Sequence, residues 1–472
     1  MRSDPVIIIP GIGQSKLILA DENGNKIKNA WPVELDQSAI VNELKSSLMK
    51  MVLFRKDGGF SDRVAAIAES ACEPLAVNED GTKKHNVIPV SYEKSLAECN
   101  DDEKKYIYKM IPMEQLGAKI GEDRLFFFAY DPFGDAYDTA SRLDGFIGFV
   151  KNKTGSEKVS LVSVSQGGVV LRVYLDLYGG KGEIGKVVNF VSALDGSSLI
   201  ADIFDDKLLL DDPASLLGTI GGKAASLASA VGMLPKDVIA NTIEKSLSVL
   251  KKSLIFNCTM MWGSIPAGRF GAILNKYPSM NESLKAKVTR LYDFTVYFPE
   301  RAKALAENGM KFYQICGCGM GIVPVCESKN IQSDGIVDVS SASFGAVCTS
   351  DESDVDVSGC VFPENTWFFN NMSHADAAFN DVALSLACDI LSDEVSGVCD
   401  KYPQFNGSRN IRKLKYELVP KAEKAISEGK NCAELEKALA DYEKILSNTV
   451  INDDSDVKEL EGRLKALLDS ES

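Results

Sequence analysis

The sequence is poor in histidine, in basic charge and in long apolar runs. Only two of the 472 residues are histidine, so chemistry that needs an imidazole must use His85 or His374. Lys and Arg total 52 against 67 Asp and Glu, and the resulting net charge of −15 argues against a nucleic-acid partner. No apolar stretch is as long as a membrane-spanning helix, and the run at residues 6–9 is too short for a secretory signal. The sequence therefore predicts a soluble, cytoplasmic protein. A chain from which an export signal had been removed would have the same features.

The eleven cysteines do not have the spacing of a disulfide framework. Cys316, Cys318 and Cys326 lie close together in the sequence, but no histidine lies near them, so they do not predict a zinc site. We expect most of the cysteines to be small core residues. No metal and no other cofactor is predicted.

Strand-like and helix-like segments alternate through much of the chain. A content of 45% hydrophobic and 25% charged residues is typical of a folded globular protein. The alternation predicts an α/β fold with a mostly parallel sheet. The expected strands are 6–9, 125–130, 159–164, 187–194, 311–316, 333–341 and 367–369, and helices are expected at 137–150, 169–178 and 379–391.

Three stretches lack this alternation and are predicted to be additions to the core. The first is polar and partly helical, and we expect an insertion or lid there. The second is rich in Leu, Ala, Ile and Met, and we expect a helical cap over the carboxyl edge of the sheet. The third carries apolar residues at three- and four-residue steps among Glu and Lys, which is typical of solvated helices. The predicted organisation is a core at 1–35, 120–200 and 308–405, an insertion at 36–119 with helices at 37–54 and 63–72, a cap at 200–307 with helices at 224–231, 238–253 and 284–293, and a helical appendage at 406–472.

Residues 159–170 have the pattern of a nucleophile elbow. An apolar strand ends at a turn of small residues, and a helix-like run follows at once, so the turn would push the Ser165 hydroxyl out at the top of the sheet. The residues two before and two after the serine must be small. Gly167 satisfies this, whereas Ser163 stands where glycine is usual. An ordinary turn between a strand and a helix is the alternative reading.

A serine nucleophile needs a base, and the base needs an acid to orient it. In this kind of fold the chain order is Ser, then Asp or Glu, then His, which selects His374 because His85 precedes Ser165. Three residues could supply the acid. Asp334 in a Ser-Asp-Gly turn is favoured, with Asp338 and Asp195 as alternatives.

Two backbone N–H groups are predicted to bind the oxyanion. One belongs to Gln166, directly after the nucleophile, and the other to Ile12, in the glycine-containing loop after the first strand. The same loop lacks the third glycine or the Lys-Ser pair of a phosphate-binding loop.

Taken together, these motifs resemble the lecithin:cholesterol acyltransferase family of α/β-hydrolase lipases and transacylases. The resemblance spans about residues 6–391. It implies that Trp262 lies over the acyl site and that Tyr130 is near the substrate, and Cys72 and Cys99 bracket the region of the family's lid disulfide. The sequence departs from the family at Ser163 and where Pro132 and Phe133 follow Tyr130 and Asp131. The segments that carry the resemblance are 7–17, 130–131, 163–167, 261–266, 333–337 and 372–374.

The sequence therefore predicts a serine acyl-ester hydrolase or transacylase. Ser165 would attack a lipid ester, either phospholipid or acylglycerol, and water or an alcohol would resolve the acyl-enzyme. The expected partner is this lipid or another ester, which the protein could meet at a membrane surface. Two alternatives are open: a non-catalytic scaffold of the same fold that binds a lipid or a protein, and an esterase for small polar esters.

Overall fold

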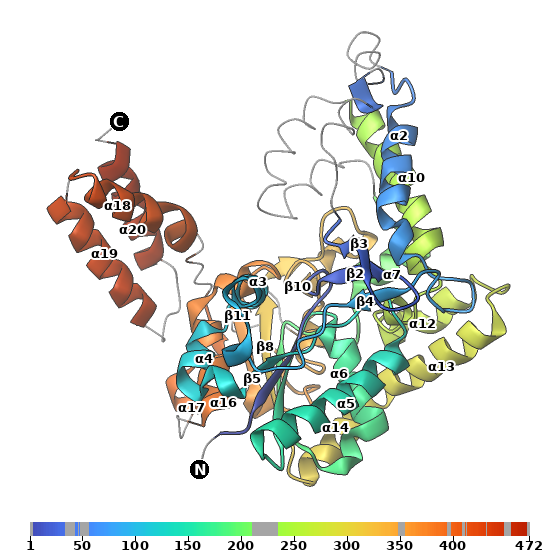
Figure 1. The fold of residues 1–472 in the computed structure, drawn as a ribbon, viewed down its shortest axis with the longest axis horizontal. Helices are drawn as coiled ribbons and strands as arrows, with labels where there is room; N and C mark the ends of the chain where they lie inside the picture. Colours follow the sequence, from blue (N-terminus) through green and yellow to red (C-terminus); the bar gives the residue numbers. More distant parts are fainter. Residues whose placement is uncertain are drawn as a thin grey trace.

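A parallel β-sheet of seven strands forms the centre of the molecule (Figure 1). The computed structural model describes residues 3–33, 43–45, 47, 56–209, 235–347, 355–393, 398–407, 411, 413–430, 432–447 and 455–469. All neighbouring strands of this sheet run parallel, which confirms the predicted α/β fold. The strand order is β12-β11-β8-β7-β6-β1-β5, with β1 at Val6–Ile9, β5 at Leu125–Phe127, β6 at Val159–Val164, β7 at Ile184–Phe190, β8 at Lys311–Cys318, β11 at Thr366–Asn370 and β12 at Phe405–Asn406.

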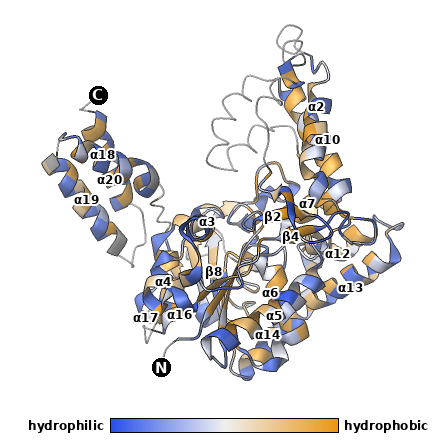
Figure 2. Cartoon of the chain, in the orientation of Figure 1, coloured by the Kyte–Doolittle hydropathy of each residue, from blue (hydrophilic) through white to orange (hydrophobic). Residues whose placement is uncertain are grey.

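Both faces of the sheet are covered, which is why its strands read as continuous apolar runs. Side chains alternate between the faces, so Ile7 and Ile9 of β1 join one hydrophobic cluster, and Val6 and Ile8 join another. Figure 2 shows hydrophobic residues gathered in the strands and hydrophilic residues along the outer sides of the surrounding helices. The first cluster lies under α5 (Ala136–Thr154), α6 (Gly167–Tyr178) and α13 (Glu282–Val296), and the second under α4 (Glu114–Ile120) and α16 (Asp381–Ser392).

Much of the predicted cap belongs to the core. From Leu254 onward, apolar residues of α11 (Thr259–Trp262), α12 (Ala267–Leu274), α13 and α14 (Phe298–Glu307) join the first cluster, and α13 and α14 pack on α6. From Leu254 onward, this part of the chain is therefore packed into one of the layers that cover the sheet. An apolar helix face looks the same in sequence whether it covers a ligand or a neighbouring helix.

Two of the three predicted additions, the insertion and the cap, meet in a projecting arm (Figure 1). It consists of α2 (Phe60–Cys72) packed against α10 (Lys236–Leu250). The Ser61 and Thr242 hydroxyls lie 2.9 Å apart across the pair. These helices match the predictions at 63–72 and 238–253. The helix predicted at 224–231 lies outside the described residues, as does most of the helix predicted at 37–54.

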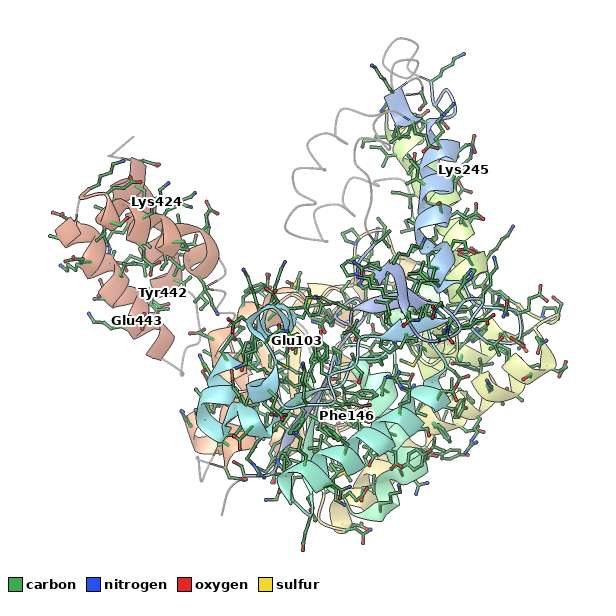
Figure 3. All side chains as sticks on the ribbon, viewed as in Figure 1. Glu103, Phe146, Lys245, Lys424, Tyr442 and Glu443 are labelled. Atoms are coloured by element: carbon green, nitrogen blue, oxygen red, sulfur yellow. The ribbon has the colours of Figure 1, made fainter. Side chains whose placement is uncertain are left out.

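The C-terminal helices stand apart from the body of the molecule in Figure 1. They are α18 (Val419–Ser427), α19 (Cys432–Ser447) and α20 (Ser455–Asp469), and they share a hydrophobic cluster of their own. Figure 3 labels Tyr442, which is buried in that cluster, and Lys424 and Glu443, which are exposed. The amphipathic spacing of the sequence thus corresponds to a small helical bundle with its own core.

The extended segment predicted at 333–341 is not formed, whereas the Ser-Asp-Gly turn predicted at Asp334 is present. Only Gln332–Ser333 (β10) is extended, pairing with Met320–Gly321 (β9), and the chain then turns into the short helix α15 (Val339–Ala342). The backbone N–H groups of Ile336 and Val337 bind the Asp334 carboxylate, so they are not available to a strand partner.

No helix within the described part of the chain is both long enough and apolar enough to cross a lipid bilayer.

Candidate active site

Ser165 lies on the sharp turn between β6 and α6. Its φ of +54° is left-handed, a conformation that a residue with a side chain rarely adopts. Two hydrogen bonds hold it there, because the Ser165 carbonyl accepts from the N–H of Gly168 at 3.0 Å and from that of Ala193 at 2.9 Å. The turn directs a half-buried hydroxyl toward the loop after β1. The strand–turn–helix context predicted for residues 159–170 is present.

Close packing against the β1 loop explains the small residues around the turn. A Cβ atom on Gly167 would lie 2.4 Å from the Ile9 carbonyl oxygen, and one on Gly11 would lie 2.7 Å from the Cβ of Ser165. At these two positions, only glycine lets the turn and the loop approach each other.

We expect Gly167→Ala to lower the stability of the fold by about 1–3 kcal/mol, because the backbone of β1 must move to admit the methyl group. Gly145→Ala is a matched control, since nothing lies within 4 Å of the added Cβ. This second change should stabilise α5 by about 0.5–1 kcal/mol, because alanine favours a helix over glycine. Thermal unfolding followed by circular dichroism measures both effects. Equal melting temperatures for the two variants would contradict this account of the turn.

Ser163, which occupies the usual glycine position, is accommodated by polar partners. Its buried hydroxyl donates to Asn189 Oδ1 at 2.8 Å and lies 2.8 Å from the Ser192 hydroxyl. Both partners come from β7 or the residues just after it. The departure from the family pattern therefore adds buried hydrogen bonds behind the turn and leaves its shape intact.

The structure brings Ser165, His374 and Asp334 together. His374 Nε2 lies 2.9 Å from Ser165 Oγ, and His374 Nδ1 lies 2.7 Å from Asp334 Oδ2. The His374 N–H also donates to the Asp334 carbonyl at 2.8 Å, so backbone and side chain together fix the ring. His374 follows β11, and the Asp334 turn follows β10, so residues far apart in sequence meet at one end of the sheet. This is the geometry of a serine nucleophile with its base and orienting acid.

Asp334 is held in position to orient the imidazole. Its side chain is 1% exposed, and Oδ1 accepts from the N–H groups of Ile336 at 3.0 Å and Val337 at 2.7 Å. A carboxylate beside Nδ1 favours the tautomer with the proton there, which leaves Nε2 free to accept the proton of Ser165. Burial lowers the pKa of His374, but the charge of Asp334 and its hydrogen bond outweigh burial, so the pKa lies above the ordinary value.

The alternative residues have other partners. Asp195 Oδ1 accepts from the Ala267 N–H at 2.9 Å, and the Asp338 carboxylate accepts from the N–H and the hydroxyl of Ser198. Burial raises the pKa of both acids. His85 lies 2.5 Å from Glu73. Each of these contacts lies outside the Ser165–His374–Asp334 group.

The two predicted oxyanion donors are on the loop after β1 and at the start of α6. Among the described residues, no hydrogen bond uses the backbone N–H of Ile12 or Gln166. Sequence reasoning missed Gln14, whose side chain accepts from the Gly11 N–H at 2.6 Å and donates to the Met110 carbonyl at 2.9 Å. Gln14 thereby ties the loop to the chain before α4. A polar residue three positions after the first glycine of such a loop is a signal that could have identified it.

The structure corrects the roles suggested for Tyr130 and Trp262. Tyr130 is fully buried, and its hydroxyl donates to the Pro10 carbonyl at 2.8 Å, so it supports the β1 loop from behind. Trp262 is also fully buried and stacks edge-on against Phe204 with 4.7 Å between ring centres. Neither side chain lines the cavity at Ser165. Both are large aromatic residues that pack in the hydrophobic core.

A cavity of about 190 Å³ opens beside Ser165 and His374. Its other lining residues come from the loop after β1, the ends of β6 and β7, the chain between β11 and α16, α16 itself and the chain before α4. The cavity therefore enters the layer of α4 and α16, on the opposite side of the sheet from α6 and α13.

Cys72 and Cys99 are free thiols, so the disulfide suggested by the resemblance does not form between them. Within the described ranges, no cluster of three or more His, Cys, Asp or Glu side chains could hold a metal ion.

No protein-family model matches the chain, and no curated protein matches it. A solved structure described as the Tle4-Tli4 complex is 12% identical in sequence, and the match covers 66% of this chain and 74% of that chain. Its TM-score is 0.25, a likeness too weak to support an argument about fold family or function.

Proposed function

We propose that the protein is a serine acyl-ester hydrolase or transacylase with an α/β-hydrolase fold. The observation that carries the proposal is the hydrogen-bonded series from Ser165 through His374 to Asp334, at 2.9 Å and 2.7 Å. The turn at Ser165 on a parallel sheet and the chain order Ser, Asp, His support this fold family. Kinship with the lecithin:cholesterol acyltransferase family is part of the proposal and is supported by the sequence motifs.

The geometry supports a two-step mechanism. Ser165 Oγ attacks the ester carbonyl while His374 Nε2 takes its proton, and Asp334 stabilises the imidazolium that forms. The N–H groups of Ile12 and Gln166 face no competing acceptor among the described residues, so they are free to bind the oxyanion. His374 then returns the proton to the departing alcohol, leaving Ser165 acylated. Water, or an acceptor alcohol in the transfer reaction, repeats the sequence and releases the acyl group.

Labelling with a fluorophosphonate probe tests the proposal. Such a probe reacts with a serine that an adjacent base activates, so the native chain should be labelled and Ser165→Ala should not. Ser283→Ala removes an exposed serine of α13 and should label like the native chain. Absence of label on the native chain, or label retained by Ser165→Ala, would refute the mechanism and favour a non-catalytic scaffold.

We expect kcat/KM for an ester to rise with pH along a limb centred above 6.5. His374 must be neutral to accept a proton, and the net effect of its surroundings raises its pKa above 6.5. A raised pKa keeps the ring protonated to higher pH, so the rise in activity occurs at a higher pH. A profile of kcat/KM against pH measures this, with thermal unfolding at each pH as the control for stability. A limb centred below pH 6.5 would contradict the inference that Asp334 raises the pKa of His374 by more than burial lowers it.

A further inference from the structure

The cavity at Ser165 has two distinct parts. Its polar side chains are those of Ser165, His374 and Gln14. The rest is lined by apolar side chains, among them Val162 and Phe190 from the sheet. In the described chain no charged side chain lines it. Even the Gln14 amide is occupied, because its oxygen and nitrogen bind Gly11 and Met110.

Such an interior selects for hydrocarbon. A polar substituent placed there would lose its hydrogen bonds to water without gaining others, whereas a methylene chain would lose nothing. Ser165 belongs to the polar part, so the carbonyl carbon of a bound ester must lie beside its hydroxyl. The apolar lining next to that carbon can hold a hydrocarbon chain of the ester.

The volume limits the length of that chain. A cavity of about 150 Å³ takes up a benzene molecule, and this one measures about 190 Å³. It therefore has room for about six to eight carbon atoms. The chain of a common membrane phospholipid is longer than this.

We propose that this cavity is the acyl site and that it selects esters of medium-chain fatty acids, with about six to eight carbons. The inference rests on the proposed function and specifies its substrate. It moves the acyl group away from the predicted cap and from Trp262, into the space between the sheet and α16.

Several of the lining residues have small side chains. Ala387 of α16 is fully buried, while Leu384, one turn earlier on the same helix, is half-buried. A larger residue at 387 would shorten the site, and a smaller one at 384 would lengthen it. Three more alanines complete this part of the wall, at positions 375, 377 and 378.

A series of nitrophenyl esters from acetate to palmitate tests the inference. For the native chain, kcat/KM should rise about two- to fourfold with each added methylene until the cavity is full. It should reach its maximum at hexanoate or octanoate and fall by at least about tenfold at palmitate. A maximum at acetate, at laurate or at palmitate would overturn the proposed acyl site.

Two variants with opposite expected effects locate the site. Ala387→Leu should lower the ratio of kcat/KM for octanoate to that for acetate by about tenfold or more, and Leu384→Ala should move the maximum to decanoate or laurate. Leu274→Ala, at a half-buried position of α12 on the other face of the sheet, is the matched control and should leave the maximum in place. If Ala387→Leu fails to fold, Leu384→Ala alone tests the proposed acyl site. A chain-length maximum that Leu384→Ala leaves unchanged would then contradict the proposal.

The same experiments separate this inference from the proposed function. If no ester of any length is hydrolysed and Ser165 takes no fluorophosphonate label, the proposed function fails. If Ser165 is labelled and esters are hydrolysed, but the chain-length profile ignores positions 384 and 387, only the acyl site fails.

Discussion

Ser165→Ala is expected to lower kcat for the preferred ester by about 10⁴- to 10⁶-fold, the largest effect of any single change in this chain. The reason is that covalent catalysis is lost entirely, while the oxyanion donors and the cavity remain. His374→Ala should cost a similar factor, because Ser165 without a base is a poor nucleophile. The double variant should be no worse than either single variant, since the two side chains act as one unit. Single-turnover and steady-state hydrolysis of one nitrophenyl ester by the four proteins gives the comparison.

The exposed Ser283→Ala variant is the control for the serine substitution and should retain native kcat. Thermal unfolding of each variant separates chemistry from folding, because Ser165 has a left-handed φ and its replacement could alter the turn. Losses that simply multiply in the double variant would show that Ser165 and His374 act independently, which their 2.9 Å contact does not allow.

The elbow and the base were predictable because their signals are local or scarce. A buried strand, a turn of small residues and a helix occur within residues 159–178, so the arrangement follows from the chain's own steric limits. Two histidines leave almost no choice of base. The orienting acid was harder to predict, because three aspartates follow strands or turns in the right part of the chain. What distinguishes Asp334 is its contact with His374 Nδ1, and two backbone N–H groups of the predicted Ser-Asp-Gly turn hold its carboxylate in place.

The surroundings of the site could not be predicted, because they depend on packing between distant segments. Residues 254–305 are apolar enough to cover a ligand, yet their apolar residues join a core cluster, and α13 and α14 pack on α6. Trp262 fills the core for the same reason. The sequence of α16 is that of an ordinary core helix. Its role in lining the cavity follows only from its position beside β6 and β7. Gln14 was missed because its partners are 96 residues away and on its own loop.

The choice among the three aspartates leads to the second large effect. Asp334→Asn should lower kcat by about 10⁴-fold while leaving the fold intact. An amide can turn its NH₂ group toward His374 Nδ1, which would place the ring proton on Nε2, and Nε2 could then no longer accept from Ser165. The neutral side chain would also lower the pKa of His374, because the attraction of the Asp334 charge is what holds that pKa up.

Asp195→Asn and Asp338→Asn are controls for Asp334→Asn, since they are the same chemical change at a half-buried and a buried aspartate. Asp195 binds the Ala267 N–H and Asp338 binds Ser198, so each should lower thermal stability with kcat within about tenfold of native. The pH profile gives a readout that loss of structure alone would not produce, because the rising limb should move to lower pH in Asp334→Asn and stay in place in the two controls. A loss of kcat in Asp195→Asn as large as that in Asp334→Asn would transfer the role of orienting acid to the strand after the elbow. Equal and small losses in all three would mean that His374 needs no carboxylate, and the 2.7 Å contact would then be structural.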